Sequence, residues 1–266
     1  MILMGNREDL NEMNYGRAKR ADAGMRGPMP GSSGAASSCI AYFGPRRHGP
    51  ELAIEDSALQ CCPDLLCKPA SAYWAGSYVP LGAGIPDIVL ASYEDEVFAL
   101  QQADPIAALI LGYLRTVNRV CVKTLCQRIP KAERAVLKSL YRLIDEQVVL
   151  QHGSLLKIAP AWKHILPEII AIEAKVKDWK TVVIQASRNR IFAHRSYVAM
   201  PESIAQGLLD EPLLVKLGLG IISVGDEGTA QIKRQGRLQR PSVWPYYYEL
   251  ARIIANKPGG TNRATI

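Results

Sequence analysis

The chain has 266 residues, of which 48% are hydrophobic and 21% charged, and its formal net charge is +7 at pH 7. These values are ordinary for a folded protein with one large or two small domains, and they exclude wholesale disorder, collagen-like repeats and coiled coil. No apolar run approaches the roughly 18 residues that a membrane-spanning helix requires.

The charge is unevenly distributed along the chain. Residues 49–104 carry one basic and nine acidic side chains, whereas residues 105–160 carry nine basic and three acidic ones. Acidic clusters attract metal ions and basic clusters attract phosphates, although a solvated surface explains both segments as well. Residues 1–48 are rich in Gly, Ser, Ala, Arg and Pro, which predicts a flexible basic tail.

The acidic segment, residues 49–104, predicts one helix followed by short strands. The helix signal runs from Glu51 to the cysteines before Pro63. Strands are predicted at residues 77–80, 85–91 and 97–100, the last pairing back as a hairpin after a turn. Asp87 is a carboxylate inside the second of these strands, directly after a proline.

The basic segment predicts three helices and a β-hairpin. The helices are expected at residues 106–115, 120–129 and 131–147, and the hairpin strands at residues 148–151 and 154–158, with His152 and Gly153 in the turn. This order is typical of a winged helix-turn-helix, in which the third helix enters a DNA groove and the wing lies on phosphates.

The third predicted helix carries a basic stripe. Arg134, Lys138 and Arg142 recur every four residues, on a different face from the apolar side chains. With Lys131 they are candidate DNA-binding residues. A solvated helical face explains the same stripe, and winged helices also dock proteins.

The next segment, residues 161–240, alternates strands and helices, which predicts an α/β sheet covered by helices. Strands are expected at residues 168–175, 196–200, 219–224 and 229–234. A helix capped by Asp178 should run to about His194, and one or two short helices should occupy residues 201–216. Residues 241–266 contain an aromatic cluster that predicts a short helical cap on the core.

Two features of these strands point to chemistry. Glu173 and Lys175 stand two residues apart, so both side chains would project from one face of a strand. Burying such a pair is costly without a partner or a purpose. If Asp87 came close to Glu173, the two carboxylates would repel unless a cation joined them, and Mg²⁺ prefers oxygen ligands.

These residues also carry a family resemblance. Pro86-Asp87, a spacer and then Glu173-Ala174-Lys175 resemble the PD-(D/E)xK nuclease superfamily, which has the restriction-endonuclease-like fold. The resemblance covers residues 49–104 and 161–240, and it implies an α/β fold with a mixed central sheet flanked by helices. It further implies that Asp87 and Glu173 bind Mg²⁺ (or Mn²⁺) and that Lys175 is the catalytic lysine.

Members of the superfamily often carry further site residues. An acidic residue in the first helix is matched by Glu55 or Glu51, and a glutamine in the helix after the lysine is matched by Gln185. The tyrosine that follows this glutamine in some branches has no match at Asn189. Asp87 and Glu173 lie 86 positions apart, more than is usual, which implies a nuclease core interrupted by residues 105–160.

The sequence therefore predicts a Mg²⁺-dependent DNA endonuclease or a nuclease-like DNA-processing protein. The alternative is a DNA-binding regulator or adaptor whose nuclease-like domain is inactive. Lys177, Lys180 and Arg188 would line the DNA groove, although an ordinary solvated helix explains them as well. DNA is the expected partner, with no membrane, and a homodimer is left open. We expect a cytoplasmic, nucleoid-associated protein, because charged residues interrupt the N-terminal apolar run early.

Overall fold

The computed structural model describes residues 40–45, 49–60, 65, 73–82 and 84–256. These residues belong to a compact unit that spans residues 36–266. The predicted tail at residues 1–48 lies almost entirely outside the described residues. No helix within the described residues has the length and apolar character needed to cross a membrane.

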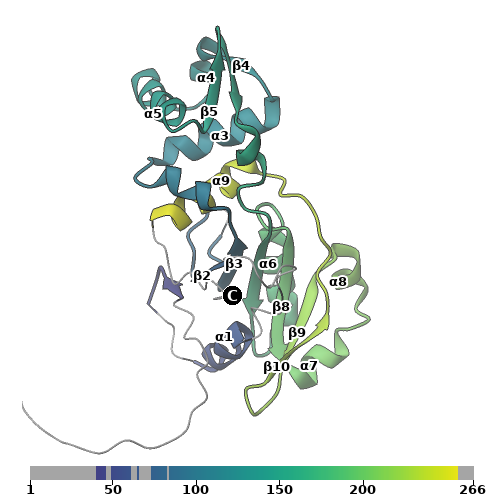
Figure 1. The fold of residues 1–266 in the computed structure, drawn as a ribbon. Helices are drawn as coiled ribbons and strands as arrows, with labels where there is room; N and C mark the ends of the chain where they lie inside the picture. Colours follow the sequence, from purple (N-terminus) through teal and green to yellow (C-terminus); the bar gives the residue numbers. More distant parts are fainter. Residues whose placement is uncertain (1–39, 46–48, 61–64, 66–72, 83, 257–266) are drawn as a thin grey trace, which may run out of the picture. The chain divides into compact units, whose positions relative to one another are not determined.

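A mixed sheet organises most of the described chain (Figure 1). Its seven strands lie in the order β1 (Ala41–Tyr42), β2 (Tyr73–Ser77), β3 (Ile88–Ser92), β7 (Ile169–Ala174), β8 (Arg195–Pro201), β9 (Gly220–Val224) and β10 (Ala230–Arg234). Pairs β1–β2, β7–β8 and β8–β9 are parallel, and pairs β2–β3, β3–β7 and β9–β10 are antiparallel. The predicted class, a mixed α/β sheet flanked by helices, is confirmed.

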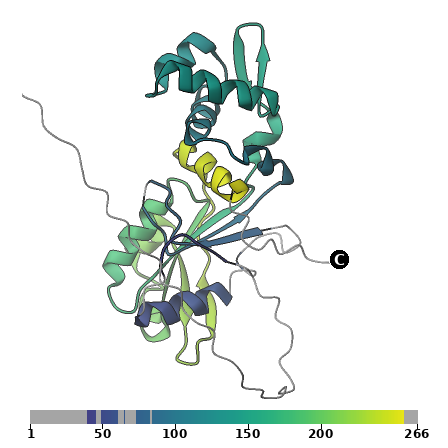
Figure 2. The same ribbon diagram turned by 90° about the vertical axis from the view of Figure 1, so that its left-hand side faces the viewer.

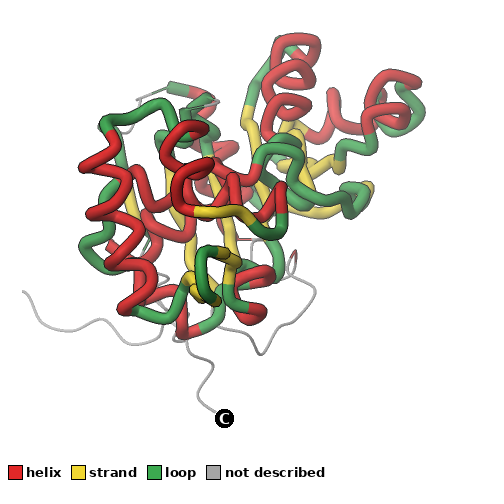
Figure 3. Tube along the Cα trace, turned by 90° about the horizontal axis from the view of Figure 1, so that it is seen from above, coloured by secondary structure: helices red, strands yellow, loops and turns green. Residues whose placement is uncertain are grey.

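Helices cover both faces of this sheet because successive strand residues point to opposite sides. Helix α1 (Pro50–Gln60) packs its apolar residues on the face that carries Ile172 and Ile222. Helix α6 (Trp179–Asn189) packs on the opposite face, against Val198 and Ile221. The short helices α7 (Glu202–Gly207) and α8 (Pro212–Leu217) join α6 there, and Figure 3 shows the strands enclosed by helices.

The basic segment forms a smaller unit of structure on its own sheet, and we call residues 105–160 the insert. It comprises α3 (Pro105–Val117), β4 (Val120–Cys121), α4 (Val122–Arg128), α5 (Glu133–Asp145), β5 (Val149–His152) and β6 (Leu155–Ile158). The three strands pair antiparallel in the order β4-β6-β5. The predicted three helices and hairpin are confirmed. The turn falls at residues 153–154, one residue later than predicted, because Gly153 supplies the positive φ of 60°.

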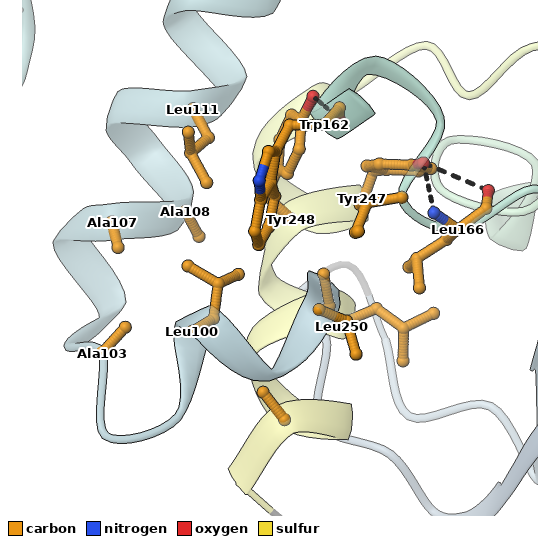
Figure 4. Close-up of a cluster of buried hydrophobic side chains, with 14 of the residues drawn as sticks. Leu100, Ala103, Ala107, Ala108, Leu111, Trp162, Leu166, Tyr247, Tyr248 and Leu250 are labelled. Atoms are coloured by element: carbon orange, nitrogen blue, oxygen red, sulfur yellow. Dashed lines mark hydrogen bonds between the residues drawn. The ribbon is translucent and has the colours of Figure 1, made fainter. Parts of the chain in front are cut away.

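Helix α9 (Trp244–Asn256) joins the insert to the large sheet, as Figures 1 and 2 show in yellow. It packs on α3 and on the 3-10 helix η1 (Asp95–Leu100) within one continuous apolar cluster. Tyr248 donates a hydrogen bond to the carbonyl of Trp162 in η2 (Pro160–His164), and Tyr247 bonds both backbone groups of Leu166 (Figure 4). The predicted helical cap is confirmed.

Three strand predictions were wrong in detail. Strand β2 covers residues 73–77 and not 77–80, because Tyr78 takes a positive φ of 58° that ends the strand. Residues 97–100 belong to η1 and do not pair as a hairpin, since β7 occupies that edge of β3. Asp87 lies immediately before β3 and not inside it. Short apolar runs cannot be assigned to strand or helix by periodicity alone.

Candidate active site

The antiparallel register of two central strands brings Asp87 and Glu173 together. Ile88 of β3 lies opposite Ile172 of β7, so the next position places Asp87 across from Glu173. Directly opposed residues point to the same face, with Cβ atoms about 5 Å apart. Asp87 is close enough for its charge and a side-chain hydrogen bond to raise the pKa of Glu173. The fold thus brings together two residues that lie 86 positions apart in the sequence.

Asp87 is held firmly at its backbone and at its side chain. Its carbonyl oxygen accepts hydrogen bonds from the Ser77 hydroxyl (2.7 Å) and from the Tyr78 amide (3.2 Å). Its Oδ2 accepts a hydrogen bond from the Ala174 amide at 2.8 Å. The aspartate therefore bridges the end of β2 and the end of β7.

Glu173 is a buried carboxyl, 4% exposed, and its environment disfavours ionisation. Burial, followed by the charge of Asp87, raises the pKa of Glu173 to about 8. Asn189 of α6 opposes this shift by donating a hydrogen bond of 2.7 Å to Oε1. At neutral pH the Asp87–Glu173 pair therefore retains a proton, unless a cation takes the place of that proton.

Lys175 lies one residue beyond the end of β7. Its charge is close enough to lower the pKa of Glu173, although this is the smallest of the effects on that carboxyl. Its Nζ lies 3.6 Å from Oε1 of Glu51 on α1, and both side chains are partly exposed, by 31% and 41%. Such partly exposed ion pairs contribute about 0–1 kcal/mol, so this contact holds the ammonium only loosely.

Glu55 is buried on α1, one turn after Glu51. The hydroxyl of Tyr78 donates to both of its carboxylate oxygens, at 3.0 and 2.8 Å. Tyr78 also contacts the backbone of Asp87, so it ties α1 to the strand end that carries the aspartate. A positive φ at a tyrosine is uncommon and strained, and such strain persists only where the surrounding structure imposes it.

Two amides of α6 stand one turn apart on the helix. Asn189 contacts Glu173, whereas the Oε1 of Gln185 is buried without a hydrogen-bond partner among the described residues. An unpaired buried amide oxygen is an available acceptor for a ligand or for water. Sequence reasoning singled out Gln185 and gave no role to Asn189 or Tyr78. The four-residue spacing from Gln185 was the signal that could have found Asn189.

The predicted DNA-binding residues are exposed, except Arg142, which is partly buried. Arg134 and Lys138 of α5 are exposed, as are Lys131 and the α6-side residues Lys177, Lys180 and Arg188. Arg142 instead donates hydrogen bonds to the carbonyls of Gln101 and Gln102, at 2.6 and 2.8 Å. Its guanidinium therefore anchors α5 to the loop after η1.

The donor set at Asp87 and Glu173 fits a hard divalent cation. Among the described residues no cluster of three or more His, Cys, Asp and Glu side chains could hold a metal ion. Mg²⁺ is commonly held by one or two carboxylates, with water and substrate phosphate supplying the other ligands. Two opposed carboxyls that share a proton, both offering oxygen, match that requirement for Mg²⁺ or Mn²⁺.

Comparisons of the chain with family models, with curated proteins and with solved structures each find no match.

Proposed function

We propose that this protein is a divalent-metal-dependent DNA endonuclease that hydrolyses phosphodiester bonds at the Asp87–Glu173 pair. One observation carries the proposal: two carboxyls far apart in sequence lie opposite each other at the ends of two central strands, with Lys175 just beyond. The order α1, β2, β3, β7, α6 and β8 supports it, because the restriction-endonuclease-like fold implies a helix, strands, the lysine-bearing strand, a helix and a strand.

Each residue of the site has a role in this proposal. Asp87 and Glu173 would hold the ion, and Asn189 fixes the direction of the Glu173 carboxyl. A bound Mg²⁺ or Mn²⁺ ion supplies positive charge that polarises a phosphodiester and lowers the pKa of water. Lys175 would exchange its exposed contact with Glu51 for a phosphate oxygen of the substrate and stabilise negative charge there. Gln185 offers a free amide oxygen to orient water.

The insert would supply DNA binding. Its order of helix, short strand, two helices and hairpin supports a winged helix-turn-helix. Arg134 and Lys138 remain candidates for DNA contact on α5, whereas Arg142 acts first as an anchor of that helix. Lys177, Lys180 and Arg188 are exposed near or on α6, and they would extend the basic surface beside the carboxyl pair.

Cleavage of supercoiled plasmid tests this proposal. We expect nicking or linearisation in Mg²⁺ or Mn²⁺ and none in EDTA. Asp87→Asn, Glu173→Gln and Lys175→Ala should each lower the rate by about a hundredfold or more, the usual cost of losing a charge-stabilising group. The matched control is Lys216→Ala, which removes an exposed lysine from α8. Undiminished cleavage by the Glu173→Gln and Lys175→Ala variants would refute the site.

The ion pair between Lys175 and Glu51 favours a second candidate, because it keeps the lysine engaged away from the carboxyl pair. In that case the protein would be a DNA-binding regulator or adaptor with an inactive nuclease-like domain. Binding of duplex DNA without cleavage in either divalent ion, and with no gain from Glu51→Gln, would select this candidate over the nuclease.

A further inference from the structure

The three-stranded sheet of the insert has one face on the helices and one face open. Val120, Leu156 and Ile158 are buried against the helices. The alternating residues Leu155 and Lys157 point the other way. Because Val120 lies opposite Leu156, the preceding position places Arg119 across from Lys157 on this open face.

A groove of about 470 Å³ lies over this open face, and we call it the sheet groove. Its lining includes the cations Arg119, Lys157 and Lys163, together with Asn118, His152 and Leu155. None of the residues that line it is Asp or Glu. The sheet groove is therefore a concave surface of one sign of charge, which concentrates anions.

The cations of the sheet groove have no partners within the described part of the chain. Within the described residues, the side chains of Arg119, Lys157 and Lys163 form no hydrogen bond or ion pair. Other cations are paired, such as Arg195 with Glu168 and Arg252 with Glu249. Like charges directly opposite one another destabilise a sheet. An anion between Arg119 and Lys157 would remove that repulsion, so the sheet groove gains from binding one.

A second groove on the insert gives the contrast. It has about 440 Å³ and lies beside α5, where the basic stripe was predicted to contact DNA. Its cations Lys138 and Arg142 face the acidic residues Asp104 and Asp145, and Arg142 is already bonded to two carbonyls. The α5 groove is therefore close to neutral, while the sheet groove is uniformly basic.

We propose that the sheet groove, and not the α5 groove, is the main contact of the insert with the phosphate backbone of duplex DNA. The choice of DNA rests on the proposed function; the choice of groove rests on the charges. Arg and Lys side chains that bind phosphates position a duplex without reading its sequence. The contact should therefore be strongly salt-dependent and indifferent to base sequence.

The test is fluorescence anisotropy of the full chain with a labelled 30-base-pair duplex of arbitrary sequence, in EDTA so that no cleavage occurs. The groove variant is Arg119→Gln with Lys157→Gln. The comparison variant is Arg134→Gln with Lys138→Gln on α5, which removes the same two charges and should lower the slope by less. The matched control is Lys216→Gln with Arg240→Gln, which removes two exposed cations outside the insert. We expect the slope of log affinity against log salt to fall by about 2 in the groove variant, about 1 for each lost phosphate contact. The control should keep the slope of the unaltered protein.

Several results would overturn the proposal. These are an unchanged slope in the groove variant, an equal loss in the groove and comparison variants, tighter binding to RNA than to duplex DNA, and no binding of the duplex by the unaltered protein. Equal thermal unfolding midpoints show that all three variants fold. The assay needs neither Asp87 nor Glu173, so the groove can be upheld when plasmid cleavage fails, and refuted when cleavage succeeds.

Discussion

At the scale of single residues, the buried Glu173 beside Asp87 couples protonation to folding. Its pKa is raised from 4.5 to about 8 by burial and by the neighbouring charge. Between these values the folded chain keeps a proton that the unfolded chain has lost. The stabilising effect of the neutral carboxyl is therefore complete below pH 4.5, and it is lost as the pH rises toward 8.

Without divalent ions, the free energy of unfolding should fall between pH 5 and 8, with Glu173 contributing up to about 1.4 kcal/mol per pH unit. Glu173→Gln should remove this contribution, because the amide does not ionise. Urea denaturation at pH 5, 6.5 and 8 measures it. A variant whose stability falls as steeply as that of the unaltered protein would show that Glu173 is not the group responsible.

Asn189 is the positioning residue of the pair, because its side-chain amide is the donor to the Glu173 Oε1. Asn189→Ala should cost about 1–3 kcal/mol of stability above pH 8, where the carboxylate would be left with one donor fewer. It should also raise the pKa of Glu173 further, which moves the pH profile of stability to higher pH.

Gln185→Ala is the matched control on the same helix, because the Gln185 Oε1 has no described partner to lose. Equal effects of the two substitutions, or an unmoved pH profile in Asn189→Ala, would contradict the positioning role.

At the scale of elements, α3 and α9 pack closely because residue 112 of α3 is a glycine. A Cβ at Gly112 would lie 2.5 Å from the backbone nitrogen of Pro245 and 2.6 Å from its ring carbons. These atoms belong to the first turn of α9 and to a rigid ring, so they cannot move aside cheaply. The glycine thus permits α9 to lie close against α3.

Gly112→Ala should destabilise the protein by about 1–3 kcal/mol through overpacking, although alanine favours a helix by about 1 kcal/mol. Gly207→Ala is the control, since a Cβ at that helix end meets nothing within 4 Å. That change should be neutral, or stabilising by up to about 1 kcal/mol. Thermal and urea denaturation compare the two. A stabilised Gly112→Ala variant would mean that α9 is free to shift.

Most helices were predictable from sequence, although α6 ends at Asn189 and not at about His194. Periodic apolar residues and the cap Asp178 mark their helices, and the Asp178 carboxylate accepts a hydrogen bond from the Thr181 amide as expected. The structure adds a second cap that was not predicted, Asp104 at the start of α3.

The strand ends were less predictable. The end of β2 depends on the positive φ of Tyr78, which no pattern of side chains predicts. The residues of η1 looked like a strand because their apolar run is too short to show a period.

At the scale of the whole chain, the sequence indicated that Asp87 and Glu173 would meet, but not which residues would hold them in place. Pro86-Asp87 and Glu173-Ala-Lys175 were proposed as one site from a family resemblance, and the register of β3 and β7 brings the two carboxyls together. Lys175 was expected beside Glu173 but contacts Glu51. Tyr78 and Asn189 were not predicted because their roles depend on contacts between elements distant in the sequence.

The net charge of +7 is a sum over segments of opposite sign. The acidic segment contributes Asp87, Glu51 and Glu55 to the candidate site, and the basic segment contributes Arg119 and Lys157 of the sheet groove. One continuous apolar cluster runs from β2 and β3 through α9 to the insert. The proposed substrate binding and the proposed chemistry would thus use opposite charges on one compact unit.

The Asp87–Glu173 pair is proposed to bind a divalent ion in place of its proton. Calorimetric titration with Mn²⁺ at pH 7, in two buffers of different ionisation enthalpy, tests it most directly. We predict binding with release of about one proton, because ligands must be deprotonated to hold a metal. Glu173→Gln and Asp87→Asn should abolish that binding. Binding by both variants with unchanged affinity, or no Mn²⁺ binding by the unaltered protein, would contradict the account.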